Sequence, residues 1–150
     1  MNPEISKNIT YKEAIFSAKA KARGLDNQPK DPAIIVNMQK VANECFEKIR
    51  AWVGNKIYVS SFYRSVIVNA AVHGEPTSNH LTGCAIDMDF NVYGGKTNKE
   101  VFDWCVDQQK QGKLDFDELL WEGGYNGWIH IAYRSFQKNR RHVGTIPDPK

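Results

Sequence analysis

Residues 78–87 of the chain read Ser-Asn-His-Leu-Thr-Gly-Cys-Ala-Ile-Asp. Residues 84–90 alternate as in a half-buried strand, which places Asp87 on the polar face of that strand. His80 lies in the loop that enters the strand. An imidazole nitrogen and a carboxylate oxygen are both good zinc ligands, at about 2.0–2.2 Å. The segment therefore predicts a strand that carries part of a metal site.

A third ligand is predicted at His130. This histidine alternates with Ile129 and Ile131 in another predicted strand, so its side chain faces away from the apolar side. Each of these polar residues alone is more often an ordinary hydrogen-bonding group. The joint pattern of His80, Asp87 and His130 is what indicates a metal site.

The first part of the chain is predicted to be helical. Thr10 and Glu13 form a capping box that starts a helix, and Gly24 ends it. Asp31 caps a second helix, whose apolar face continues to Gly54. We expect both helices to be scaffold.

The rest of the chain is predicted to be mostly strands. Alternating residues predict strands over 56–61, 84–90, 116–121 and 128–134. A short helix follows Ser65, a longer one covers 97–112, and a glycine-rich turn at 123–127 joins the last two strands. Helices followed by a meander of strands are typical of α+β domains. We expect N-terminal helices packed on a small antiparallel sheet that carries the zinc site.

Composition indicates a folded protein rather than a disordered one. The 150 residues are 41% hydrophobic and 25% charged, which predicts one domain over residues 1–150. A net charge of +3 is too small to predict nucleic-acid binding. The basic residues near the end predict a solvated basic tail over 135–150. A weak preference for anionic polymers is the alternative for that tail.

Residues 1–10 contain no apolar run typical of a signal peptide, and no stretch approaches the roughly 20 apolar residues of a membrane helix. We therefore expect synthesis in the cytoplasm and no membrane insertion. Cys45, Cys84 and Cys105 form no Cys-x-x-Cys pair, so we expect small buried residues in a reduced protein.

The chain resembles the zinc D-alanyl-D-alanine carboxypeptidases and their relatives, which include vancomycin-resistance D,D-dipeptidases and phage L-alanyl-D-glutamate endolysins. Their motif S-x-H-x-x-G-x-A-x-D, followed later by a W-x-H strand, is matched by Ser78, His80, Gly83, Ala85, Asp87, Trp128 and His130. Residues 61–65 resemble the S-x-Y-R-S/T element of the family, and residues 18–27 resemble its compact phage and bacterial subgroup. The resemblance covers residues 9–134.

The resemblance implies a metallopeptidase with one Zn²⁺ held by His80, Asp87 and His130. The fourth position would hold water, whose pKa zinc lowers to about 7, and this water would be the nucleophile. The expected substrate is a peptidoglycan stem peptide, cut by a carboxypeptidase or by an endolysin-type endopeptidase. We further expect a monomer that acts at the cell wall or periplasm after release, as a bacteriophage endolysin would.

Three more residues receive roles from the resemblance. Arg64 resembles the arginine that steadies the substrate carbonyl as negative charge develops, although a surface salt bridge is the alternative. Ser78 would orient the substrate or hydrogen-bond within the loop of His80. Many relatives carry an acid three residues before the last histidine, where this chain has Gly127. Glu122 is the nearest carboxylate on the incoming strand, and a hairpin would bring it beside His130 as the general base.

The run from Phe116 to Glu122 also resembles the Phe-Asp-then-Glu strand of the hedgehog signalling domain. That resemblance, with Gly127 in the usual acid position, keeps open a non-catalytic zinc-containing binding module and an exposed-turn role for Glu122. Asp89 is either a hydrogen-bond partner of a ligand histidine or a solvated carboxylate. His73 and His142 fit no ligand spacing, so we expect surface histidines there.

Overall fold

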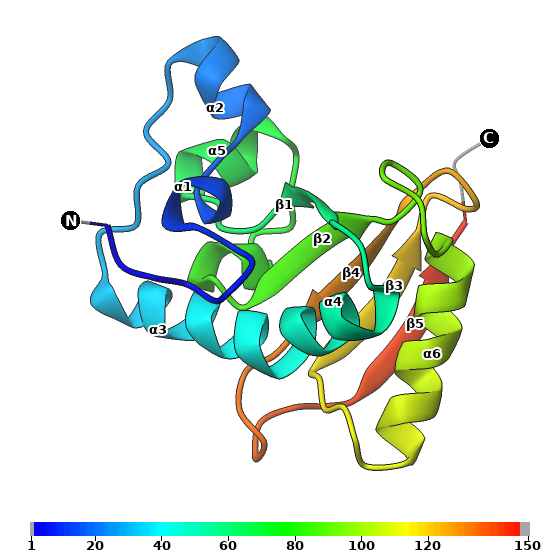
Figure 1. Ribbon diagram of the computed structural model, residues 1–150. Helices are drawn as coiled ribbons and strands as arrows, with labels where there is room; N and C mark the ends of the chain where they lie inside the picture. Colours follow the sequence, from blue (N-terminus) through cyan, green and yellow to red (C-terminus); the bar gives the residue numbers. More distant parts are fainter. Residues whose placement is uncertain (1, 148–150) are drawn as a thin grey trace.

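A computed structural model describes residues 2–147 (Figure 1). The helical segments are α1 (Tyr11–Ala14), α2 (Ala18–Arg23), α3 (Pro32–Val41), η1 (Ala42–Phe46), α4 (Glu47–Val53), α5 (Val66–Ala71), η2 (Asn79–Thr82) and α6 (Asn98–Lys110). The strands are β1 (Tyr58–Ser61), β2 (Ala85–Asp89), β3 (Glu118–Glu122), β4 (Trp128–Ala132) and β5 (His142–Ile146). Within residues 2–147, no helix combines the length and apolar character needed to cross a membrane.

The strands form one sheet in the order β1-β2-β4-β3-β5. The α+β class is confirmed, but the sheet is mixed rather than antiparallel, because β5 runs parallel to β3. Residues 142–146, expected in a solvated tail, are therefore an edge strand. This strand pairs there because the edge of β3 that faces away from β4 has backbone N–H and C=O groups that need partners. At the two ends of the pairing, the Asp117 carbonyl accepts from the His142 amide at 3.0 Å, and the Ile146 carbonyl accepts from the Gly123 amide at 2.9 Å.

The predicted second helix is confirmed as the continuous run α3, η1 and α4. Asp31 caps it by accepting a hydrogen bond from the Ala33 amide at 2.9 Å, and Gly54 ends it in the left-handed conformation. The middle segment η1 is a single π-helical turn. Its Cys45 and Phe46 are buried in the core together with Met38 of α3.

The predicted first helix is wrong in one respect, because the structure has two short helices, α1 and α2. The capping box of Thr10 and Glu13 is present. Beyond it, the Ala14 carbonyl accepts from the Tyr63 amide and the Ile15 carbonyl accepts from the Asn27 side chain. These tertiary partners take the carbonyls that would have continued the helix. Ser17 is the N-cap of the next helix, α2, and its side chain accepts a hydrogen bond from the Ala20 amide.

The two faces of the sheet have different roles. Ile86, Met88, Leu119, Ile129 and Ile131 point into the core and are fully buried. The core also contains apolar residues of α3, η1, α4 and α6, and Figure 1 shows these helices along the sheet. The opposite face carries the polar side chains of β2, β3 and β4, and η2 borders it. The predicted alternation on β2 and β4 is thereby confirmed.

Cys45, Cys84 and Cys105 are buried free thiols, as expected.

Candidate metal centre

The pairing of β2 with β4 brings two of the predicted ligands together. Asp87 and His130 are direct register partners, and both side chains lie on the polar face of the sheet. His80 comes from η2, which enters β2. The three residues are only 2%, 6% and 8% exposed for His80, Asp87 and His130. One candidate ligand atom from each lies within 4.8 Å of the others, so the structure assembles the predicted triad.

The orientation of His80 is fixed by the backbone. Its Nδ1 lies 2.6 Å from the Phe62 carbonyl oxygen, and a carbonyl only accepts, so Nδ1 carries the proton. Nε2 is then left with a lone pair. This atom lies 3.2 Å from Asp87 Oδ2 but makes no hydrogen bond, although it is buried. A buried acceptor without a donor is costly unless a cation binds it, so this atom fits a metal ligand.

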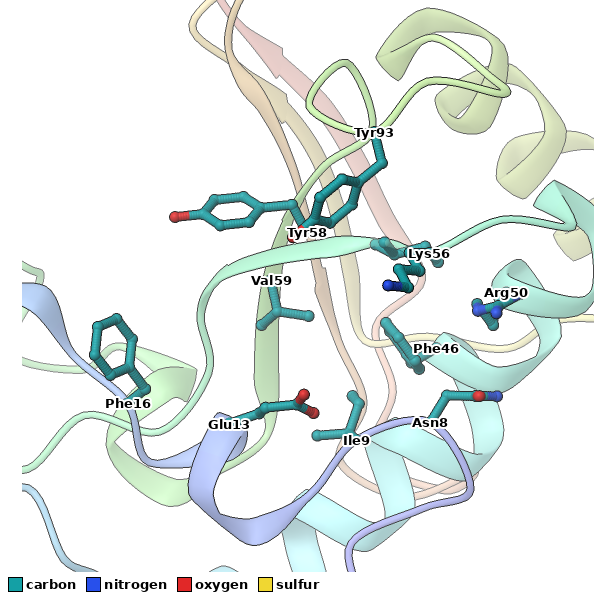
Figure 2. Close-up of a pocket in the computed structure, with 11 residues that line it drawn as sticks. Asn8, Ile9, Glu13, Phe16, Phe46, Arg50, Lys56, Tyr58, Val59 and Tyr93 are labelled. Carbon is teal, nitrogen blue, oxygen red and sulfur yellow. The ribbon is translucent and has the colours of Figure 1, made fainter.

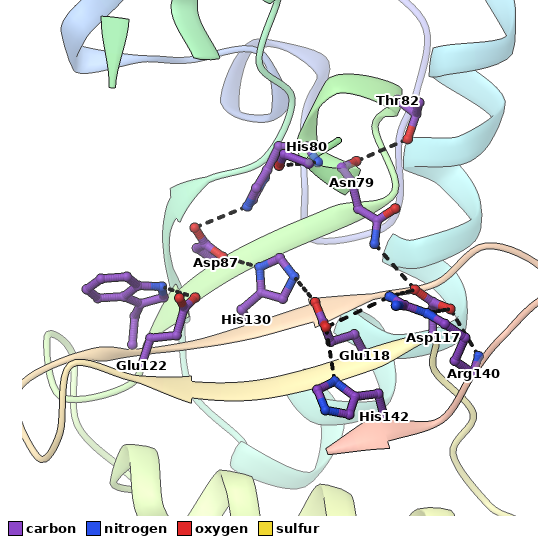
Figure 3. A network of polar contacts seen from close by, with 12 residues as sticks. Asn79, His80, Thr82, Asp87, Asp117, Glu118, Glu122, His130, Arg140 and His142 are labelled. Carbon is purple, nitrogen blue, oxygen red and sulfur yellow. Dashed lines mark hydrogen bonds and ion pairs between the residues drawn. The ribbon is translucent and has the colours of Figure 1, made fainter. Parts of the chain in front are cut away.

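His130 completes the cluster through its other ring nitrogen. Its Nδ1 lies 2.8 Å from Asp87 Oδ1 (Figure 3). Burial opposes charge on this imidazole, but the nearby Asp87 and Glu118 carboxylates outweigh burial and raise the pKa of His130. Burial likewise opposes ionisation of Asp87, yet the two histidines hold the pKa of that carboxyl well below its usual range. The cluster therefore stabilises positive charge, as a cation site requires.

Glu122 lies on the same face of the sheet as the cluster. It is the register partner of Trp128 across the β3–β4 hairpin, whose indole Nε1 donates to Glu122 Oε2 at 3.0 Å. Figure 3 shows its carboxylate beside His130. Burial, followed by the negative charge of Asp87, raises the pKa of Glu122. The hairpin thus places this carboxylate where the sequence predicted it, and its catalytic role stays a prediction.

Arg64 is held at the edge of the cluster by three side chains. Its Nε donates to Ser61 Oγ at 3.0 Å, and Nη1 donates to Asn69 Oδ1 at 3.1 Å. Nη2 lies 3.5 Å from Asp87 Oδ2. Since the Arg64 side chain is only 17% exposed, it is no ordinary surface arginine.

Ser78 makes the loop hydrogen bond that was one of its two expected roles. Its hydroxyl accepts from the His80 amide at 3.1 Å and so caps η2. Its side chain also borders the cleft described next, so contact with a substrate stays a prediction.

A polar cleft of about 880 Å³ opens over the cluster. Its lining includes Arg64, Ser78, Glu122, His80, Asp87 and His130. Residues that the sequence did not assign to the site also line it, among them His73, Asp117, Glu118, Arg134 and Arg140. The predicted site residues therefore share one cleft.

Of the carboxylates near the cluster, Glu118 and not Asp89 lies beside a candidate ligand histidine. Asp89 contacts no ligand histidine; its Oδ1 accepts from the Asn91 amide and from the Asn98 side chain. Glu118 instead lies 3.5 Å from His130 Nε2. The alternation of Glu118, Leu120 and Glu122 on β3 was the signal that could have found it, because residues two apart share a face.

His142 is a surface histidine, as predicted, but it also contacts Glu118. Although 56% of its side chain is exposed, its Nδ1 lies 3.1 Å from Glu118 Oε2. No local pattern identifies this contact, because it depends on the parallel pairing of β5 with β3.

A second cavity of about 490 Å³ lies at the β1 edge of the sheet (Figure 2). Its lining combines Phe46 and Val59 with exposed aromatic residues, including Phe16, Tyr58 and Tyr93. None of its lining residues belongs to the His80, Asp87 and His130 cluster, so this cavity is separate from the candidate metal site.

Comparison with known proteins agrees with this geometry. A family model described as Peptidase M15 matches residues 7–132, which is most of the chain and includes every member of the cluster. No curated protein matches the chain.

Proposed function

Because the chain belongs to the peptidase M15 family, we propose that it hydrolyses peptide bonds in peptidoglycan stem peptides, with one zinc ion bound by His80, Asp87 and His130. Family membership makes the chain a metallopeptidase of a zinc-dependent family. The substrate and the ligand assignment are the parts that we propose.

The orphaned Nε2 of His80 is the observation that supports zinc at this place. Its lone pair, the Asp87 carboxylate and His130 Nδ1 converge at the base of an open cleft. Three protein ligands beside an open position are typical of catalytic zinc, whereas structural zinc has four. The geometry therefore favours catalysis over a purely structural zinc module.

Glu122 is the proposed general base. Zinc held by His80, Asp87 and His130 would supply a Lewis acid for the attacking water and the peptide carbonyl. Glu122 takes a proton from that water and returns it to the amine of the leaving peptide. Its position beside His130 and its raised pKa fit this double role, because a raised pKa makes the carboxylate a stronger base toward water and keeps the proton on the carboxyl until the leaving amine can take it. The Trp128 indole fixes its orientation.

Arg64 is the proposed partner of the substrate oxygen. Its guanidinium is held in place before substrate binds, so it is preorganised for negative charge that develops on the carbonyl. In a carboxypeptidase it would hold a terminal carboxylate, and in an endopeptidase it would hold an internal carbonyl. The proposal therefore covers both carboxypeptidase and endopeptidase action. We place that action at the cell wall.

The test is release of amino groups from purified peptidoglycan by the zinc-loaded protein, followed by mass analysis of the fragments. We expect release that stops after chelation and returns with added zinc. Glu122→Ala should lower the rate by about 10²–10⁴-fold, because it removes proton transfer. The fragment masses identify the bond and so separate exopeptidase from endopeptidase action.

Glu44→Gln is the matched control, because this exposed glutamate pairs with Lys48 on the helix side of the molecule, away from the cleft. It should hydrolyse peptidoglycan at the wild-type rate. If a protein that binds one zinc releases nothing from peptidoglycan, the wall-hydrolase proposal is wrong and a non-catalytic zinc module becomes the better account.

A further inference from the structure

His130 has a second anchor on the side away from Asp87. Its Nε2 lies 3.5 Å from Glu118 Oε1, while Glu118 Oε2 lies 3.1 Å from His142 Nδ1 and 3.8 Å from Arg140 Nη2 (Figure 3). The Glu118 side chain is only 20% exposed. A carboxylate with three cationic or imidazole neighbours in one wall of the cleft differs from an ordinary solvated residue.

The sheet register explains why Glu118 reaches this place. On β3, Glu118 is the register partner of Ala132 on β4 and of His142 on β5. It shares a face with Leu120, which is the register partner of His130. Glu118 and Glu122 therefore flank His130 along β3, one on each side. Of these two glutamates, Glu118 is the one that contacts His130 Nε2.

The two candidate ligand histidines use opposite nitrogens, and each therefore needs its own anchor. In His80, Nδ1 donates to the Phe62 carbonyl and Nε2 faces Asp87. In His130, Nδ1 faces Asp87, so a neutral imidazole must carry its proton on Nε2 if Nδ1 is to bind metal. Glu118 is the acceptor that this proton meets.

Further contacts hold Glu118 in turn. Arg140 Nη2 lies 2.8 Å from Asp117 Oδ2, and the same oxygen accepts from the Asn79 side chain at 3.3 Å. Asn79 directly precedes His80 in η2. A chain of polar contacts thus runs from His130 through Glu118, Arg140 and Asp117 to Asn79, the residue before His80.

We propose that Glu118 is a positioning residue for His130: it fixes the tautomer with hydrogen on Nε2 and turns Nδ1 toward the metal, while His142 and Arg140 hold Glu118 in place. This role rests on the proposed metal site but not on the identity of the substrate. The C-terminal strand β5 is then part of the metal centre, although it supplies no ligand.

Zinc affinity tests this role independently of catalysis. Competition with a chromophoric chelator should show that Glu118→Ala binds zinc about 10–100-fold more weakly than wild type, as expected for loss of an anchor of a ligand histidine. Glu118→Gln, which keeps one carbonyl acceptor, should lose less. Glu44→Gln is the control, since it removes the same kind of charge from an exposed helix position away from the cluster and should keep wild-type zinc affinity.

A second readout excludes a merely structural role. In nitrogen-15 spectra of the zinc-loaded protein, His130 should carry its proton on Nε2, and this signal should broaden or vanish in Glu118→Ala while the His80 signal remains. Wild-type zinc affinity in both Glu118 variants, or no zinc binding by the wild type, would overturn the inference. If Glu118→Ala loses zinc affinity as expected but the zinc-loaded wild type does not hydrolyse peptidoglycan, the positioning role of Glu118 stands and only the proposed substrate is wrong.

Discussion

At the scale of a single residue, the surroundings of Arg64 distinguish a surface salt bridge from a side chain placed to contact substrate. The sequence left open a surface salt bridge or a contact with substrate. The structure shows an ion pair with Asp87, but in a cleft and with two further hydrogen bonds from the guanidinium. Those bonds require several donors in one plane, which lysine lacks.

Arg64→Lys should therefore lower kcat/KM by roughly 10²-fold, similar to loss of one oxyanion donor. Steady-state kinetics on a soluble stem peptide would measure this change. Arg23→Lys, on the exposed last turn of α2, is the control and should behave as wild type. Equal kcat/KM for Arg64→Lys and wild type would show that a positive charge alone suffices.

At the scale of elements, Gly83 sets the approach of η2 to α3. Its φ is +78°, and a Cβ atom there would lie 2.8 Å from both the Ile34 carbonyl oxygen and Met38 Cγ. Because η2 carries His80, this close contact with α3 also helps to set the position of His80 relative to the sheet.

Gly83→Ala should destabilise the protein for two reasons, the left-handed backbone and the clash with α3. Gly112→Ala measures the backbone effect alone, because Gly112 has φ +72° but no atom within 4 Å of an added Cβ. We expect Gly83→Ala to lose about 1–3 kcal/mol more than Gly112→Ala, which is the usual cost of overpacking. Urea unfolding of both variants would measure the difference. Equal losses would mean that α3 moves aside freely.

Glu47 links the N-terminal segment to α4. Its carboxylate accepts from Ser6 Oγ at 2.6 Å, from the Asn8 amide at 2.9 Å and from the Asn8 side chain at 2.6 Å. Burial raises the pKa of Glu47, but these hydrogen bonds outweigh burial and lower it below its ordinary value of 4.5. The ionised form is therefore the one that stabilises the folded chain.

A lowered pKa in the folded state gives stability above the unfolded pKa and loses it as the pH falls through the folded pKa. The wild type should thus be more stable than Glu47→Gln at pH 7, and the difference should shrink as the pH falls below 4.5. Urea unfolding of both proteins between pH 3 and 7, in roughly one-unit steps, would measure it. A difference that stays constant with pH would contradict the linkage.

At the scale of the whole molecule, the candidate metal ligands His80, Asp87 and His130 join η2 to the middle of the sheet. A ligand that binds only the folded state stabilises it by about 2.7 kcal/mol when its free concentration is 100 times Kd. For a chain of this size, each kcal/mol raises Tm by roughly 2–4 °C.

Zinc removal should therefore lower Tm by roughly 5–10 °C under those conditions. Calorimetry with and without a chelator would measure the shift. His80→Ala is the control, because it removes one candidate ligand and its Tm should respond much less to chelation. An equal Tm for the loaded and chelated wild type would mean that zinc does not bind the folded cluster.

Much of this molecule follows from local sequence signals. Thr10, Asp31 and Thr97 start helices where predicted, because a capping side chain bonds to backbone within three residues. The alternation around Asp87 and His130 fixes which face each side chain occupies, because it depends only on the period of a strand. Fold class, helix caps and the candidate ligand set thus came from sequence patterns and the motif resemblance.

Other features depend on partners far along the chain. The split of the first helix requires Asn27 and Tyr63 to take its carbonyls. The parallel pairing of β5 requires the free edge of β3, and this pairing alone brings His142 to Glu118. The sequence by itself determined which side chains could bind a metal, because those signals act over a few residues. Only the tertiary structure decided how those side chains are anchored, because hydrogen-bond partners distant in sequence meet only when the sheet has assembled.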